Sequence, residues 1–281
     1  MEQKNICRMV SALLIILFIG ACSPPPVAPT LQQPPMTETQ AAQASPTAIG
    51  TEVLLTAEGT SMPFPDAGLC ANTYYPIRQG ATWTYRSTGG PAGEYSFTDT
   101  ITAVGQDSFT LTTQIGGLTN LQDWNCTPEG LLAHQLGGAP AAMLNSQGIQ
   151  LRLNATNASG VVFPSQINPG DTWQHTLDVA GNVTVTNEEA EATGTAQMNF
   201  SALGNESVTV PAGTFDALKI QVDTTLNVDA SYEGITLPVA FRGAHTYWFA
   251  PGVGWVKSTG TGNFLAASFS ETTELQSYNI P

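Results

Sequence analysis

Hydrophobic and polar residues alternate along most of the chain after residue 74, and the 3.6-residue period of an amphipathic helix is nearly absent. The clearest run extends from Leu218 to Val228, where Leu, Ile, Val and Thr occupy every second position. A second run extends from Ile235 to Phe249, and Pro238 within it indicates an edge strand or a bulge. Only 131–144 offers a helical segment, and its Gly and Pro residues weaken that expectation. The pattern therefore predicts an all-β fold, an antiparallel meander that forms a strongly curved sheet, an open barrel or a sandwich.

The chain contains an internal echo that hints at two related β-modules. Tyr75-Pro76 followed by Gly80-Ala81-Thr82-Trp83 recurs as Phe163-Pro164 followed by Gly170-Asp171-Thr172-Trp173. Each copy is an aromatic-Pro pair and a G-x-x-W segment that opens an alternating strand. Chance similarity is the alternative, because the rest of each half does not align.

The N-terminus has the features of a signal peptide, which we assign to residues 1–21. Lys4 and Arg8 precede an apolar run over 9–21, which is too short to cross a bilayer as a helix. Residues 22–65 are rich in Pro, Gln, Ala and Thr and are expected to form an extended, disordered tether. Residues 66–281 then form the β-rich domain, and the echo suggests halves 66–160 and 161–281.

The signal peptide ends in Ile19-Gly20-Ala21-Cys22, which resembles the lipobox of bacterial lipoproteins. The resemblance implies cleavage before Cys22 and acyl chains such as palmitate on that cysteine. The protein would then be an extracytoplasmic lipoprotein anchored in a membrane, at the cell surface or in an outer membrane. An ordinary secreted protein cleaved after Ala21 is the alternative.

The number of cysteines and the low fraction of charged residues agree with an extracytoplasmic location. Cys7 leaves with the signal peptide and Cys22 takes lipid, so Cys70 and Cys126 remain to form one disulfide; two free buried thiols are the alternative. Only 11% of the residues are charged, and the net charge is -14. Such a negative chain repels nucleic acid, which we exclude as a partner.

Three motifs occur in a fixed order after the tether. They are P-x-x-x-G-x-x-W-x-Y from Pro76, V-T-V-P-A-G-T-F from Val208 and Y-W-F-A-P-G-V-G-W-V-K from Tyr247. Their order resembles a group of uncharacterised bacterial lipoproteins and secreted proteins. The resemblance supports the fold and the location, and it brings no catalytic residues to this chain.

Catalytic chemistry has little support in the sequence. Motifs for a nucleophile elbow, a zinc protease, a phosphate-binding loop or an EF-hand are missing, so we predict a non-enzymatic protein with no catalytic residues, no metal and no cofactor. His175 and His245 both occupy inward positions of their predicted strands. They are interpreted either as core histidines or as residues that meet in a ligand or metal site inside the barrel. Trp248 is expected to face outward, where it is a candidate for contact with a sugar or a partner.

Three functions remain for comparison with the structure. The first is a tethered, non-catalytic binding or interaction module for an apolar ligand, a glycan or an envelope protein. The second is a structural or adhesive cell-envelope protein with no small-molecule site. The third is a hydrolase, which would require a cleft that gathers two carboxylates, or a serine with one of the histidines.

Overall fold

The computed structural model describes residues 68–281 except 91, 136–148, 186–187 and 265–266. The signal peptide, Cys22 and the tether expected from the sequence lie outside the described residues. The described elements are a short 3-10 helix and thirteen strands: η1 (Gly68–Cys70), β1 (Thr82–Gly90), β2 (Gly93–Val104), β3 (Ser108–Ile115), β4 (Leu118–Thr127), β5 (Gly130–Ala133), β6 (Ile149–Gly160), β7 (Phe163–Pro164), β8 (Thr172–Val185), β9 (Glu188–Val210), β10 (Gly213–Tyr232), β11 (Ile235–Ala250), β12 (Gly254–Phe264) and β13 (Ala267–Asn279).

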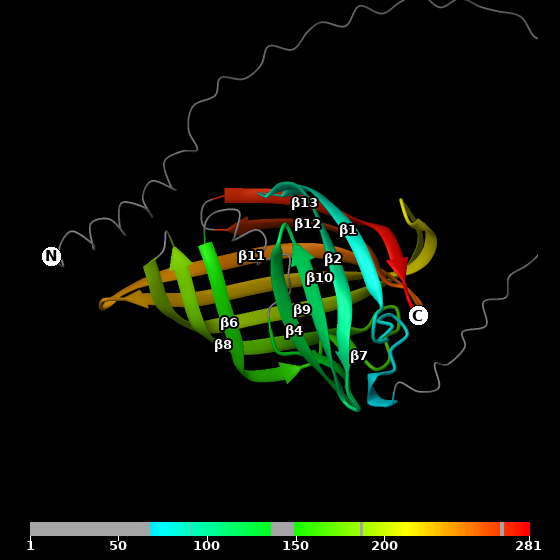
Figure 1. The fold of residues 1–281 in the computed structure, drawn as a ribbon, viewed down its shortest axis with the longest axis horizontal. Coiled ribbons are helices and arrows are strands. Elements are labelled where there is room, and N and C mark those ends of the chain that lie inside the picture. Colours follow the sequence, from blue (N-terminus) through cyan, green and yellow to red (C-terminus); the bar gives the residue numbers. More distant parts are fainter. Residues whose placement is uncertain (1–67, 91, 136–148, 186–187, 265–266) are drawn as a thin grey trace, which may run out of the picture. The chain divides into compact units, whose positions relative to one another are not determined.

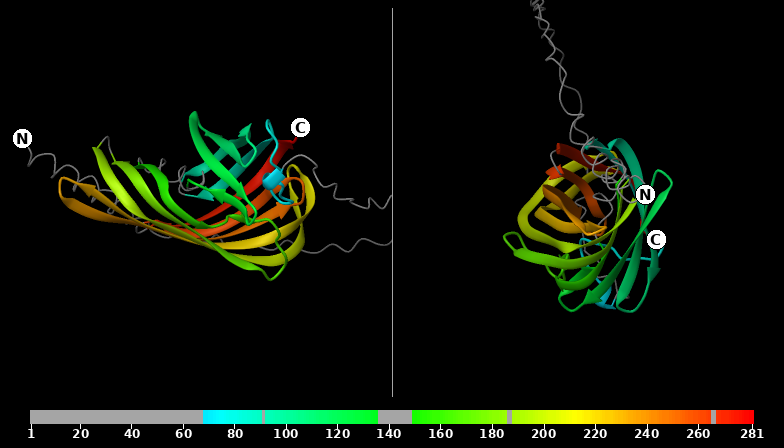
Figure 2. Two further views of the ribbon diagram at one scale, coloured as in Figure 1. Left: turned by 90° about the horizontal axis from the view of Figure 1, so that it is seen from below. Right: turned by 90° about the vertical axis from the view of Figure 1, so that its left-hand side faces the viewer.

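All of these strands belong to one antiparallel sheet in the order β6-β8-β9-β10-β11-β12-β13-β1-β2-β3-β4-β5-β7. The sheet curls strongly into a half-barrel (Figures 1 and 2). Its two edge strands, β6 and β7, are consecutive in the chain, and β6 approaches the other edge of the sheet where Ala155 N donates to His134 O, directly after β5, at 3.2 Å. The all-β, strongly curved sheet predicted from the alternation is confirmed.

The longest alternating runs form the longest strands. On β10, the side chains of Leu218, Ile220 and Val222 are buried, and burial continues at every second position to Val228 apart from the half-buried Thr224. On β11, Pro238 pairs with β10, whereas the pairing with β12 begins only at Phe241. Pro238 therefore lies on a local edge of the sheet, a position where proline is tolerated in strands.

The internal echo corresponds to a shared local geometry. Gly80 N donates to Ile101 O and Gly170 N donates to Ala202 O, each at 2.8 Å. Both glycines have positive φ, +85° and +95°, which explains why the turn before each strand uses glycine. Both segments lie in the same continuous sheet, and the division into two modules stays a prediction.

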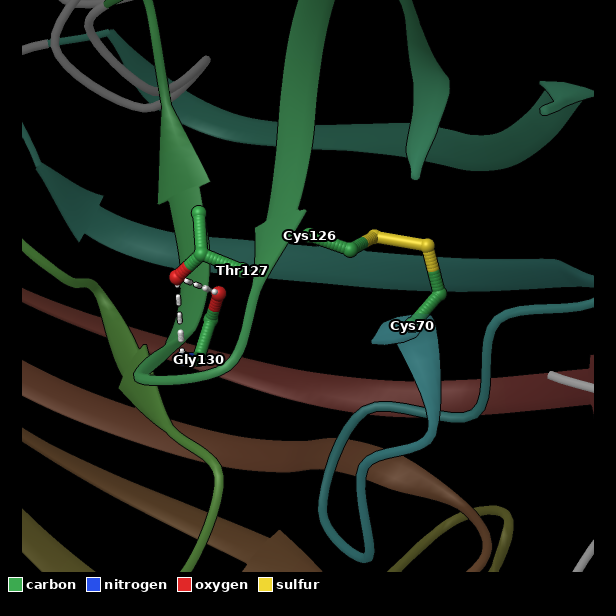
Figure 3. The surroundings of a disulfide bond; sticks show 4 residues. All are labelled: Cys70, Cys126, Thr127 and Gly130. Atoms are coloured by element: carbon green, nitrogen blue, oxygen red, sulfur yellow. Dashed lines mark hydrogen bonds between the residues drawn. A yellow bond between two sulfur atoms is a disulfide. The ribbon is translucent and has the colours of Figure 1, made fainter. Parts of the chain in front are cut away.

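A disulfide joins η1 to the end of β4 (Figure 3). Cys70 and Cys126 are both buried, and their Cα atoms are 4.9 Å apart. The cysteine pairing expected from the sequence is present. The helical expectation over 131–144 is wrong where the structure describes it, because 131–133 belong to strand β5. No helix among the described residues has the length and apolar character needed to cross a membrane.

Candidate functional site: an apolar cavity with two carboxyl groups

The concave side of the sheet forms a partly open cavity of about 270 Å³. Small-molecule sites have volumes of about 300 to 1,000 Å³, so this cavity is near the size of a small ligand site. Strands from both halves of the described chain, β2–β5 and β7–β13, contribute to its wall. Most of the lining is apolar, and its aromatic members are Tyr75, Tyr95, Phe97, Trp124, Phe163, Trp173, Phe200, Phe241, Tyr247, Phe249, Trp255 and Phe269.

The aromatic rings hold each other in place. Tyr75 contacts Phe109, Trp124 and Phe163, with ring centroids 5.4 to 5.8 Å apart. Trp173 stacks on Phe200 at 5.1 Å. Because such pairs are rigid and well packed, the cavity is a preformed part of the fold.

Glycines on β11 and β12 provide space for rings that line the cavity. A Cβ at Gly260 would lie 2.0 Å from His245 Cδ2, so this ring rests directly on the glycine. Likewise, a Cβ at Gly262 would lie 2.5 Å from the ring of Phe269. These glycines are therefore required by the close approach of a neighbouring aromatic ring.

The first polar group in the wall is Asp99 on β2. Its Oδ1 accepts a hydrogen bond of 2.5 Å from Thr113 Oγ1 on β3, and both residues line the cavity. Burial raises the pKa of the Asp99 carboxyl to about 6, an effect that the hydrogen bond from Thr113 reduces. The Asp99 carboxyl therefore lies in apolar surroundings and changes its protonation state at a pH slightly below neutral.

The second polar group is Glu271 on β13. Its Oε1 accepts hydrogen bonds from Tyr95 Oη, at 2.7 Å, and from Ser87 Oγ. Thr273 Oγ1 in turn donates to Ser87 Oγ at 3.0 Å, which directs the Ser87 hydroxyl proton toward the carboxylate. Burial, followed by the negative charge of Glu271, raises the pKa of Tyr247 to about 12. The tyrosines next to Glu271 are therefore neutral hydrogen-bond donors at physiological pH.

The two histidines do not form a common site. His245 lines the cavity, and burial lowers its pKa although the nearby Glu271 opposes this shift. His175 is outside the cavity lining, is fully buried, and has Nδ1 3.2 Å from Ser159 O. The described residues contain no group of three or more His, Cys, Asp or Glu side chains arranged to hold a metal ion. The structure does not bring His175 and His245 together in the cavity, because they project from strands three positions apart in the sheet and His175 turns to β6.

Trp248 lies outside the cavity lining as well. Only 8% of its surface is exposed, because its indole Nε1 donates to Glu206 Oε1 at 2.8 Å and Lys219 Nζ lies 5.3 Å from its ring centroid. The outward orientation expected for Trp248 agrees with its place outside the lining, but the indole is not exposed, since side chains from β9 and β10 cover it. Trp83 and Trp173 each donate the indole N–H to a backbone carbonyl.

Sequence reasoning missed the two carboxyl groups. Asp99 lies between Phe97 and Ile101 on the inward face of β2, and Glu271 lies between Phe269 and Thr273 on that of β13. An acidic residue at an inward position of an alternating strand was the available signal. It is informative because charged side chains are rarely buried without a functional or structural reason.

The fold and the cavity define an all-β half-barrel with an apolar interior. Within the chain, residues 134–262 match the model of the family described as DUF3108-like. A comparison with curated proteins gives no match.

Three solved structures are similar to the chain at low identity. One is a protein described as exported, with a YmcC-like fold, from Bacteroides fragilis (TM-score 0.47, 16% identity, 75% of this chain and 100% of that chain). The others are a protein described as a lipoprotein from Parabacteroides distasonis (TM-score 0.39, 11% identity, 74% and 99%) and the hypothetical lipoprotein YmcC from Escherichia coli (TM-score 0.33, 13% identity, 73% and 87%). The resemblance to uncharacterised bacterial exported proteins and lipoproteins is confirmed, and no activity, ligand or partner is transferred from these matches.

Proposed function

We propose that the protein is a membrane-anchored, extracytoplasmic lipoprotein whose half-barrel binds a small apolar ligand without catalysis. The observation that supports this function is the cavity, which is preformed, mostly apolar and lined by residues of strands β2–β5 and β7–β13. A purely structural or adhesive protein would need no such space, because well-packed interiors contain few voids larger than a water molecule. The lipobox at Cys22 and the tether support the anchored location.

A hydrolase is the second candidate, because the cavity gathers two carboxyl groups, Asp99 and Glu271. Paired catalytic carboxyls shift each other's pKa values when they are close together. Burial and the hydrogen bond from Thr113 account for the shift of Asp99, without a contribution from Glu271. The two carboxyl groups therefore lack the mutual coupling of a catalytic pair, which favours binding over acid-base catalysis.

Filling the cavity tests the binding function. Val222 on β10 is buried and lines the cavity, whereas the neighbouring Gln221 has the opposite orientation on the same strand. We expect the neutral apolar dye N-phenyl-1-naphthylamine to bind the wild-type protein with increased fluorescence. Val222→Phe should weaken binding about tenfold or more, because the added ring occupies the ligand's volume.

Gln221→Phe is the matched control, since it adds an aromatic ring on the outer face of the same strand. It should leave dye affinity unchanged. Failure of the wild-type protein to bind the dye, or equal loss of affinity in both variants, would contradict the proposed function.

A further inference from the structure

The wall of the cavity has an unbalanced set of charges. Asp99 and Glu271 both line it. Every Lys and Arg among the described residues lies outside this lining: Arg78, Arg86, Arg152, Lys219, Arg242 and Lys257. An anionic ligand headgroup would therefore meet negative charge and find no cationic partner, at a cost that increases in a low-dielectric interior.

Two of the basic residues outside the wall form ion pairs with carboxylates that are also outside it. Arg86 forms an ion pair with Glu94 at 2.7 Å, with both side chains more than half exposed. Lys257 pairs with Glu274 at 3.0 Å. The wall carboxyls are therefore left without a positive counterpart among the described side chains.

Three hydrogen-bond donors of the wall are already used, whereas the indole N–H groups of Trp124 and Trp255 have no partner among the described residues. Thr113 donates to Asp99, and Tyr95 donates to Glu271. Gln122 Nε2 donates to Gln135 O at 3.0 Å. Since the protons of Thr113 and Tyr95 point at the two carboxyl groups, an anionic headgroup beside Asp99 and Glu271 would gain no hydrogen bond from them, whereas the carboxylate oxygens can accept more hydrogen bonds.

Aromatic rings surround the Glu271 side of the cavity. Tyr95 contacts Phe97 with centroids 6.0 Å apart, Phe97 contacts Trp255 at 6.0 Å, and Trp255 contacts Tyr247 at 5.6 Å. Ring faces attract cations, and aromatic cages with a nearby carboxylate are the usual way in which proteins bind quaternary ammonium groups. The net charge of -14 further raises the local concentration of cations.

We propose that the ligand of this cavity is a cationic amphiphile, with an apolar chain among the aromatic rings and an amine or quaternary ammonium headgroup at Glu271 and Asp99. This inference rests on the proposed function and specifies the ligand class. His245 does not reverse the charge balance, because burial lowers its pKa and it is neutral at neutral pH.

A pair of surfactants with the same chain tests the proposal. The mature chain with Cys22→Ser carries no acyl chains that could compete for the cavity. Isothermal titration at pH 7.5, below the micelle concentrations, should show that dodecyltrimethylammonium binds about tenfold or more tightly than dodecanoate. Glu271→Gln and Asp99→Asn should each weaken binding of the cation about three- to tenfold, by removing a close charge of opposite sign.

The controls are substitutions of the same type on exposed positions. Glu191→Gln on β9 and Asp229→Asn on β10 remove equal charge from exposed side chains and should leave both affinities unchanged. Equal binding of the two surfactants, or preference for dodecanoate, would overturn the proposal of a cationic ligand. The proposed binding function would then still stand. Binding of neither surfactant, together with no binding of the neutral dye, would overturn the binding function itself.

Discussion

At the scale of single residues, the carboxyl group of Asp99 makes the stability of the folded protein depend on pH. Its carboxyl has a pKa of about 6 in the folded protein, against a model-compound value of 3.8. Between these values the folded state holds a proton that the unfolded state has released. The free energy of unfolding therefore falls as the pH rises through this window, and the loss persists above it.

Asp99→Asn should remove this dependence. We expect the variant and the wild type to have similar stability at pH 4, and the variant to be more stable at pH 7 by on the order of 1 to 3 kcal/mol. Urea denaturation at pH 4, 5, 6 and 7 measures the difference. Asp229→Asn, on an exposed position, controls for the loss of one charge, and a stability difference for Asp99→Asn that does not change with pH would contradict the assignment.

At the scale of elements, the pairing of β11 with β12 depends on glycines beneath aromatic rings. His245 pairs with Gly260 across the two strands, and its ring occupies the space where a side chain of Gly260 would lie. The pair therefore meets two requirements. His245 on β11 places its ring in the cavity wall, and Gly260 on β12 leaves space for that ring because it has no Cβ.

Gly260→Ala should destabilise the protein by about 1 to 3 kcal/mol, because the new methyl group and the imidazole overlap. In a His245→Ala background the same substitution should be neutral or stabilising, since the space is then free. The coupling energy from a double-mutant cycle, measured by chemical denaturation, checks this expectation. Additive effects of the two substitutions would show that the ring does not rest on the glycine.

At the scale of the whole domain, the disulfide joins the segment before β1 to the far part of the sheet. Cys70 and Cys126 are separated by 56 residues, which include β1, β2, β3 and most of β4. The covalent link thus restricts a third of the strands in the unfolded chain.

Replacing both cysteines by alanine should lower the free energy of unfolding by about 4 kcal/mol, the chain-entropy value for a loop of this length. Thermal denaturation of the Cys22→Ser chain with and without dithiothreitol measures the effect. The reductant should destabilise the parent chain and leave the Cys70→Ala/Cys126→Ala variant unchanged. Two reactive thiols in the denatured, unreduced parent chain would contradict the disulfide.

The sequence alone determined the strands, because a side chain's face on a strand depends only on its position along the chain. The run from Leu218 to Val228 identified β10 and its buried face, and Pro238 identified a local edge. The glycines Gly80 and Gly170 marked the turns that open β1 and β8. These are local properties, and the period of two residues records them directly.

Only the tertiary structure decided the site. Asp99 and Glu271 are far apart in the sequence, and they share a cavity because thirteen strands curl around one interior. The curl depends on strand twist and on register shifts such as those at Thr84/Tyr85 and Trp248/Phe249, which alternation does not reveal. Pairing across the sheet also buried Trp248 and separated His175 from His245, because which strands become neighbours is a non-local choice that no single segment encodes.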